Sequence, residues 1–206
     1  MYSREEAIQK IIEEKGLKAI PNLIKLLDDD DLEVRELARD ALSIMAPEGK
    51  EYILKEFKKR FEMYIKDDTV LLYLAELLSD LRCQEIVENL KMSFSMFTDE
   101  RAFILIIESL LKITQDESYL DILKTYLEND ETEIQEISIM AVSELPCKKS
   151  IDILAEKYYT TRDKSIKALI LDSLIKIIAT AYDLLPYFEE KYPDLYDILK
   201  WDLQKR

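Results

Sequence analysis

The chain has 206 residues, 48% of them hydrophobic, so it is long enough to bury a sizeable core. Only 2 glycines and 5 prolines are present, which leaves little material for hairpin turns, flexible linkers or phosphate-binding loops. With 29 basic residues against 43 acidic ones, the net charge is -14, and such a chain repels the phosphates of nucleic acids and of anionic membranes. We therefore expect an all-helical protein with no nucleic-acid and no membrane partner.

The sequence also predicts a cellular compartment. No apolar run approaches the roughly 18 to 20 residues that a membrane span needs. The first ten residues, MYSREEAIQK, lack the basic-then-apolar order of a signal peptide. Two cysteines give no disulfide framework. Together these features predict a cytoplasmic protein.

A nearly constant period runs through the chain. Residues 19–34 align without a gap with residues 119–134, and in both stretches an acidic segment separates two apolar-periodic segments. The first apolar residue of each expected second helix recurs at steps of 36, 32, 32 and 32; these anchors are Val34, Val70, Ala102, Ile134 and Ile166. A period of this size is typical of stacked helical hairpins.

The period predicts the helices in chain order. First helices are expected over 18–28, 50–66, 84–97, 117–128 and 149–160, and second helices over 32–45, 69–81, 100–114, 132–145 and 163–179. Residues 1–16 and 182–206 are expected to form terminal caps, because an end unit has no neighbour to cover its apolar side. Pro186 and Pro193 are expected to end or restart helices in the second cap. The predicted fold is an all-α solenoid of about five hairpins with caps, in a single domain over residues 1–206.

Four aspartates, Asp28 to Asp31, stand directly before the helix expected at 32–45. A calcium loop that began at Asp28 would need a glycine and a glutamate at the positions that hold Glu33 and Arg39. Aspartates at a helix start accept hydrogen bonds from free backbone amides, and a good cap stabilises a helix by about 0.5 to 2 kcal/mol. We therefore expect helix capping and no metal site.

The segment from residue 18 to residue 48 resembles a HEAT repeat, particularly the variety found in phycobilin lyases. The residues that carry the resemblance are Pro21 with its neighbouring leucines, the turn 29–31, Val34, Arg35, Ala38, Ala41 and Leu42. The fourth unit departs from the pattern, with Asp121 and Gln135 in place of Pro21 and Arg35. The resemblance implies a right-handed solenoid whose second helices line the concave surface. It also implies that Asp29 or Asp31, and Arg35, form bonds between neighbouring units.

Histidine is absent from the chain. This removes imidazole-based catalytic triads and nearly all catalytic zinc sites. It also separates the chain from deoxyhypusine hydroxylase, a HEAT-repeat enzyme whose iron is held by His-Glu motifs. The net charge opposes the basic groove of the alkylpurine DNA glycosylases, another HEAT-like group. We expect no catalytic residue and no cofactor.

The side of the second helices opposite their buried face carries a column of acidic residues. Each residue advances about 100 degrees around a helix axis, so positions 2, 6, 9 and 13 after each anchor share this strip. The acidic ladder, as we name the set, consists of Asp40, Glu76, Glu108 and Asp172 at position 6, where Met140 interrupts the column, with Glu36 and Glu136 at position 2. Leu72, Ile104 and Ala168 lie between the acids. Such a strip predicts binding of a protein or peptide with basic character, although acids also fall on any exposed strip of so acidic a chain.

Two other groups of residues have simpler interpretations. Lys55, Lys58, Lys59 and Arg60 are expected to form the solvated face of an amphipathic helix. The aromatic residues of the tail, among them Trp201, are expected to complete the second cap.

The favoured function is therefore a non-enzymatic scaffold or adaptor that binds its partner on a concave acidic face. One alternative is a phycobilin lyase-like catalyst or chromophore-handling protein, which a carboxyl group of raised pKa in a closed apolar pocket would favour. Another is a regulatory subunit of a larger complex.

Overall fold

A computed structural model describes residues 4–203, and helices are the only regular elements in this range. In chain order they are α1 (Arg4–Lys15), α2 (Ile20–Leu26), α3 (Leu32–Met63), α4 (Thr69–Asp80), α5 (Val87–Ser93), α6 (Glu100–Thr114), α7 (Ser118–Tyr126), α8 (Thr132–Val142), α9 (Lys148–Thr160), α10 (Lys164–Thr180), α11 (Leu185–Lys191) and α12 (Pro193–Leu203). The prediction of an all-helical protein is confirmed over the described range. Residues 1–3 and 204–206 of the expected caps lie outside it. None of the helices in residues 4–203 is long and apolar enough to cross a membrane.

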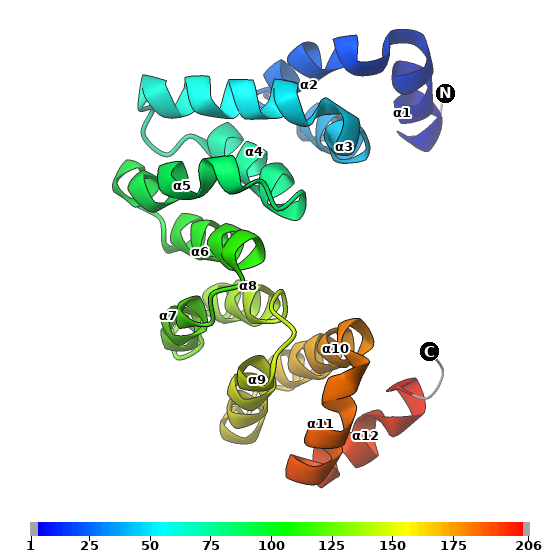
Figure 1. The fold of residues 1–206 in the computed structure, drawn as a ribbon, viewed down its shortest axis with the longest axis vertical. Helices are drawn as coiled ribbons and strands as arrows, with labels where there is room; N and C mark the ends of the chain where they lie inside the picture. Colours follow the sequence, from blue (N-terminus) through cyan, green and yellow to red (C-terminus); the bar gives the residue numbers. More distant parts are fainter. Residues whose placement is uncertain (1–3, 204–206) are drawn as a thin grey trace. The chain divides into compact units, whose positions relative to one another are not determined.

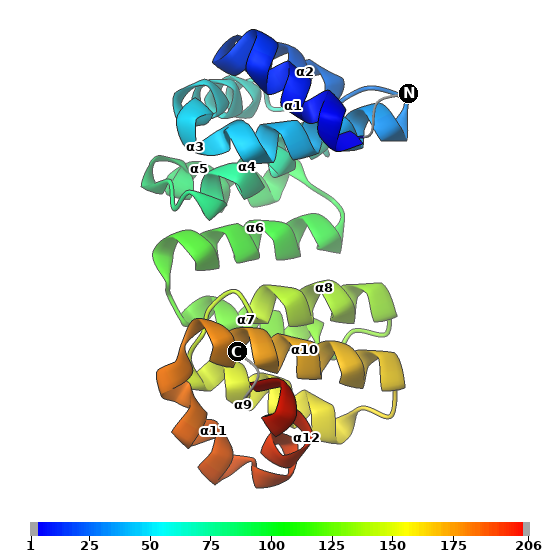
Figure 2. The ribbon, with the colours of Figure 1, turned by 90° about the vertical axis from the view of Figure 1, so that its right-hand side faces the viewer.

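Backbone contacts group the chain into two compact units, residues 1–98 and 99–206. In the first unit, α2 packs on α3, and α3 packs on α4. In the second unit, α6, α8 and α10 pack one against the next and α7 packs on α9, so the helices form two layers. Figure 2 shows α8 and α10 side by side in one of these layers. The expectation of a single domain over residues 1–206 stays a prediction.

The repeat anchors occupy equivalent places in successive helices. Each is the second or third residue of its helix; Val70, Ala102, Ile134 and Ile166 are buried and Val34 is half-buried. Three further apolar residues of α6 and α8, Ile107, Leu111 and Ile139, are buried too, whereas Leu171 and Ile175 of α10 are only half-buried.

Acidic side chains cap four of the helices that carry these anchors. The carboxylates accept hydrogen bonds from backbone amides of the first helical turn: Asp31 from Glu33 N (2.8 Å), Asp68 from Leu71 N (3.1 Å), Asp99 from Arg101 N (2.9 Å) and Asp163 from Ser165 N (2.7 Å). These bonds satisfy amides that have no partner within the helix. The capping interpretation of Asp31 is confirmed. Within residues 4–203, no group of three or more cysteine, aspartate or glutamate side chains is arranged to hold a metal ion.

One expected helix break is absent. The segments predicted at 32–45 and 50–66 form a single helix, α3, which runs through Pro47 and changes direction along its length in Figure 1. Proline removes one hydrogen bond of the helix and crowds the preceding turn, which is a usual cause of a kink. Gly49 is buried where a β-carbon would overlap the Cδ1 atom of Ile20. The hairpin therefore forms by bending of one helix, and a glycine lets the bend approach α2.

Several ion pairs join residues one repeat apart. With a separation of 32 residues in each case, they are Asp28 with Arg60 (2.6 Å), Arg101 with Glu133 (2.7 Å), Lys124 with Glu156 (2.6 Å) and Glu144 with Lys176 (2.5 Å). The same separation recurs on different helices, so neighbouring hairpins within each unit pack in the same register.

Candidate functional site

Two adjoining pockets lie between α3 and α4 in the first unit. The first, of about 310 Å³, is lined by Leu27, Leu32, Arg35, Glu36, Arg39, Thr69, Val70 and Tyr73. The second, of about 230 Å³, is lined by Arg39, Asp40, Ser43, Tyr73, Glu76, Leu77 and Asp80. We name them the amino-end pocket and the carboxyl-end pocket, and together the α3–α4 groove.

Arg39 and Tyr73 belong to both pockets and form the wall between them. The Tyr73 hydroxyl donates a hydrogen bond to the Arg39 carbonyl oxygen at 2.8 Å, and the Arg39 guanidinium lies 4.7 Å from the centre of the Tyr73 ring. Arg39 Nη2 also donates to Glu76 Oε2 at 3.0 Å. Burial raises the pKa of Tyr73 above its usual value, so this hydroxyl keeps its proton and its role as donor into the alkaline range.

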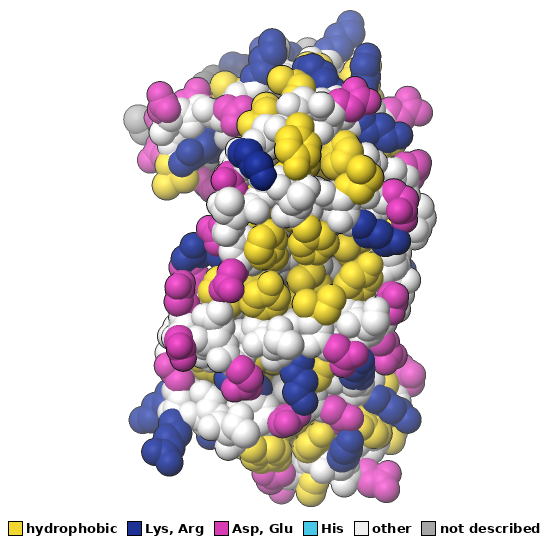
Figure 3. All heavy atoms as spheres, turned by 90° about the vertical axis from the view of Figure 1, so that its left-hand side faces the viewer, with side chains coloured by type: hydrophobic (Ala, Val, Ile, Leu, Met, Phe, Trp, Pro, Cys, Tyr) yellow, Lys and Arg dark blue, Asp and Glu magenta, His cyan; other side chains and the backbone are white. Residues whose placement is uncertain are grey.

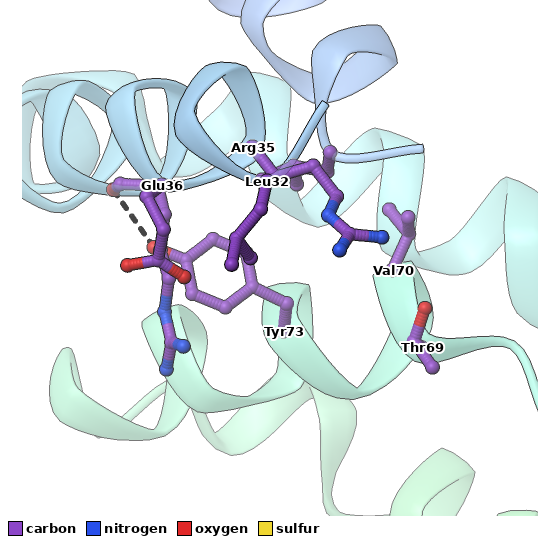
Figure 4. A pocket seen from close by; sticks show the side chains of 8 residues that line it. Leu32, Arg35, Glu36, Thr69, Val70 and Tyr73 are labelled. Atoms are coloured by element: carbon purple, nitrogen blue, oxygen red, sulfur yellow. Dashed lines mark hydrogen bonds between the residues drawn. The ribbon is translucent and has the colours of Figure 1, made fainter. Parts of the chain in front are cut away.

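The two helices run in the same direction along the groove. Residues 32–39 of α3 face residues 69–73 of α4 in the amino-end pocket, and residues 39–43 face residues 73–80 in the carboxyl-end pocket. Figure 4 shows the Arg35 side chain extending toward Thr69 and Val70 at the start of α4, whereas Glu36 lies beside Tyr73. On both helices, therefore, residues of lower number line the amino-end pocket and residues of higher number line the carboxyl-end pocket.

The two pockets carry opposite formal charge. Two arginines and one glutamate line the amino-end pocket, which gives +1, and its remaining lining is largely apolar, with Leu27, Leu32 and Val70. Three acids, Asp40, Glu76 and Asp80, line the carboxyl-end pocket against Arg39, which gives -2. The groove thus combines an apolar recess with an acidic one.

The residues of the acidic ladder divide between the two units. Glu36, Asp40 and Glu76 all line the α3–α4 groove. In the second unit, Asp172 lines a pocket of about 410 Å³ formed by residues of α10, and Glu136 is half-buried on α8.

Glu108, the remaining ladder residue, begins a chain of alternating charges. Its carboxylate lies 2.8 Å from Lys112 Nζ, Lys112 lies 3.9 Å from Glu144, and Glu144 binds Lys176. One apolar residue of the expected exposed strip, Ile104, is instead fully buried. Both α7 and α8 pack on α6, the helix that carries it.

Sequence reasoning missed Arg39, Tyr73 and Asp80 as groove residues. Tyr73 stands three positions after Val70, on the helix face expected to be buried. A tyrosine on a buried face usually brings its hydroxyl to the rim of the core, where it can reach a polar partner, and this was a signal that could have identified Tyr73. Arg39 and Asp80 could not be found in this way, because charged residues are common on every exposed face of this chain.

Arg35 does not form the bond between units that the HEAT resemblance implies. Asp29 and Asp31 accept hydrogen bonds from the backbone amides of Asp31 and Glu33. Within residues 4–203, the Arg35 guanidinium joins no ion pair and donates no hydrogen bond. The expectation for these residues was wrong, and Arg35 instead lines the mouth of the amino-end pocket.

Arg60 makes the connection between hairpins in the first unit. Its Nη1 donates to both carboxylate oxygens of Asp68, at 2.8 and 2.9 Å, and its Nη2 donates to Asp28. The side chains of Arg60 and Asp68 are only 16% and 3% exposed. Arg60 therefore departs from the expected solvated face of its helix, while Lys55, Lys58 and Lys59 are exposed as expected.

A second cluster of polar groups holds the carboxyl-terminal cap. Asp152 on α9 accepts hydrogen bonds from the hydroxyls of Tyr187 (2.7 Å) and Tyr192 (2.8 Å) and from Lys191 Nζ (2.9 Å). Burial acts to raise the pKa of Asp152, but these bonds outweigh it and hold the pKa below its usual value. Burial also raises the pKa of Tyr192 to about 12. Trp201 takes no part in a buried cap, since it is 67% exposed.

Exposed apolar side chains also occur outside the groove. In the first unit they include Met63, Tyr64, Ile65 and Met92, and on the face drawn in Figure 3 hydrophobic side chains gather at the surface among acidic and basic ones. The α3–α4 groove differs from such a surface because it is concave and places apolar groups beside charges of both signs. These are the features of a binding site. No protein-family model and no curated protein matches the chain, so the HEAT resemblance stays a prediction from residues 18–48.

Proposed function

We propose that the protein is a non-enzymatic scaffold or adaptor that binds a protein or peptide of basic character in the α3–α4 groove. The observation that carries this proposal is the adjoining of an apolar pocket, with Leu27, Leu32 and Val70, and an acidic one, with Asp40, Glu76 and Asp80. An apolar side chain of the partner occupies the first pocket, and a lysine or arginine of the same segment occupies the second. Glu108 lines neither pocket and is not part of the proposed site.

The expected affinity is modest. Burial of one leucine-sized side chain contributes about 1.5 to 3 kcal/mol. A cation held by partly exposed carboxylates adds about 1 kcal/mol. Two such anchors, after the cost of ordering a flexible segment, correspond to dissociation constants in roughly the micromolar to millimolar range. This strength suits an adaptor that releases its partner readily.

The groove is proposed to lie on the concave side of a HEAT-like α-solenoid. The ion pairs that join residues 32 apart support this arrangement, as does the packing of α6, α8 and α10 in one layer. The pKa values of the Glu85, Asp99, Glu133 and Asp152 carboxyl groups are shifted downward, opposite to the raised pKa that would favour the lyase-like alternative.

A peptide selection tests the proposal. The purified protein is immobilised and presented with a phage library of random twelve-residue peptides, and the wild type is compared with D40N/D80N and with D172N as a matched control in the second unit. We expect peptides that combine lysine or arginine with a leucine-like or aromatic residue, and we expect D40N/D80N alone to lose them. Circular dichroism confirms that both variants are folded. Absence of enrichment, enrichment of acidic peptides, or equal enrichment on D40N/D80N would contradict the proposal.

A further inference from the structure

Arg35 gives the α3–α4 groove a cationic end. Its side chain is exposed and extends along the mouth of the amino-end pocket toward Thr69 and Val70 (Figure 4). Arg39, in the same groove, is held by Tyr73 and Glu76, whereas the Arg35 guanidinium has no bonding partner among residues 4–203. Arg35 is therefore the arginine of this groove that is available to a ligand.

Two acids near the amino end of the groove are already engaged by other groups. Asp31 caps α3 by accepting from Glu33 N. Asp68 is bound by Arg60 through both carboxylate oxygens. Glu36, the one acid that lines the amino-end pocket, lies beside Tyr73 (Figure 4). The formal charge of this pocket thus remains +1, against -2 in the carboxyl-end pocket.

The distance between the two ends sets a spacing in the ligand. Thr69 lines the amino-end pocket and Asp80 lines the carboxyl-end pocket, and these positions on α4 are separated by about 16 Å along a helix axis. An extended peptide covers about 3.3 Å per residue. About five residues therefore bridge the two ends.

We infer that the groove recognises a bipolar peptide segment. In this segment an acidic residue directly precedes or follows the apolar anchor, and a basic residue lies on the other side of the anchor, about five positions from the acidic residue. The acidic residue pairs with Arg35, the anchor enters the recess of Leu27, Leu32 and Val70, and the basic residue enters the pocket of Asp40 and Asp80. The inference rests on the proposed function and adds to it a second charge of opposite sign. A purely basic partner would place a cation against Arg35 and bind less well.

The test uses a fluorescein-labelled peptide obtained from the selection described above. The position that flanks its apolar anchor, on the side away from the basic residue, is made glutamate, glutamine or lysine in three versions. Fluorescence anisotropy gives the affinity of each for the wild type and for Arg35→Gln. On the wild type we expect glutamate to bind about fivefold more tightly than glutamine, with lysine weakest. On Arg35→Gln we expect the three affinities to converge.

The outcomes separate this inference from the proposed function. Equal binding of the glutamate and glutamine versions to the wild type, or tightest binding of the lysine version, would overturn the inference while leaving the basic-peptide proposal intact. A preference for glutamate that persists unchanged in Arg35→Gln would also overturn it, because the discriminating cation would lie elsewhere. If the proposed function itself is wrong, the peptide selection already shows it, because that selection then yields no peptide that combines basic and apolar residues.

Discussion

Tyr73 holds Arg39 at two points, through a hydrogen bond from its hydroxyl to the Arg39 carbonyl oxygen (2.8 Å) and through a ring that lies 4.7 Å from the guanidinium. Because Arg39 also binds Glu76, the three side chains tie α3 to α4 at the middle of the groove. The wall between the two pockets is thus part of the packing of the first unit as well as of the candidate site.

Replacement of Tyr73 by phenylalanine removes the hydroxyl and keeps the ring. We expect the free energy of unfolding to fall by about 1 kcal/mol, the usual contribution of one intramolecular hydrogen bond. Urea denaturation followed by circular dichroism measures the change. Tyr52→Phe is the matched control, since Tyr52 is 49% exposed on the same helix as Arg39, and we expect it to leave stability unchanged. Equal stability of Tyr73→Phe and wild type would contradict the role assigned to the hydroxyl.

Arg60 should matter far more than its lysine neighbours. Arg60→Met leaves the Asp68 carboxylate, 3% exposed, without its cation, and removal of one partner of a buried ion pair costs about 3 kcal/mol or more. Lys59→Met breaks an exposed pair with Glu56 and should cost no more than about 0.5 kcal/mol. Chemical denaturation of the two variants compares the costs. Similar losses would show that Arg60 is not a structural clamp.

Gly49→Ala tests the contact between α3 and α2. Helix propensity alone favours alanine by about 1 kcal/mol, but the added β-carbon would overlap Ile20 Cδ1 in a fully buried site, and overpacking costs about 1 to 3 kcal/mol. We therefore expect a net loss of stability.

The same substitution in an Ile20→Val background supplies the control, because valine lacks the Cδ1 atom. Gly49→Ala should be less destabilising there than in the wild type, and the difference is the coupling between the two positions. A gain of stability in the wild-type background, or no coupling, would mean that the site has room for the β-carbon.

Alkaline pH should weaken the carboxyl-terminal cap. Burial raises the pKa of Tyr192 to about 12, so the folded state prefers the protonated hydroxyl. The stability that this group contributes is complete below about pH 10, the pKa of an unfolded tyrosine, and is lost as the pH rises through the folded value near 12. The hydrogen bonds that Lys191 Nζ donates to Tyr187 and Asp152 likewise raise the pKa of Lys191, which acts in the same direction.

Urea midpoints at about pH 8 and about pH 11 measure this loss. Tyr192→Phe should lose less stability between the two conditions than the wild type does. Tyr182→Phe, at a position that is 65% exposed, should lose as much as the wild type. An equal loss in Tyr192→Phe would contradict the assignment.

The sequence predicts most of this architecture because the apolar period survives where the HEAT-like motif does not. Ile134 and Ile166 are buried third residues of their helices, as Ala102 is, although only residues 18–48 resemble the family closely. The continuity of α3 through Pro47 could not be predicted, since a proline can either end a helix or kink it.

The candidate site was only partly predictable for a different reason. Helical periodicity places Glu36, Asp40 and Glu76 on one strip, and all three line the groove. Periodicity does not say which acids are neutralised, as Glu108 is by Lys112. Nor does it say which cation is left unpaired, because that depends on side-chain partners from other helices.

The most direct test of the proposed site is to map where a peptide binds. The ¹⁵N-labelled protein is titrated with a basic and apolar peptide from the selection, and backbone amide shifts are followed by nuclear magnetic resonance. We predict saturable shifts for residues 35–43 and 69–80, with residues 148–160 unaffected. Shifts concentrated in the second unit, or no saturable shifts at all, would contradict the assignment of the α3–α4 groove as the binding site.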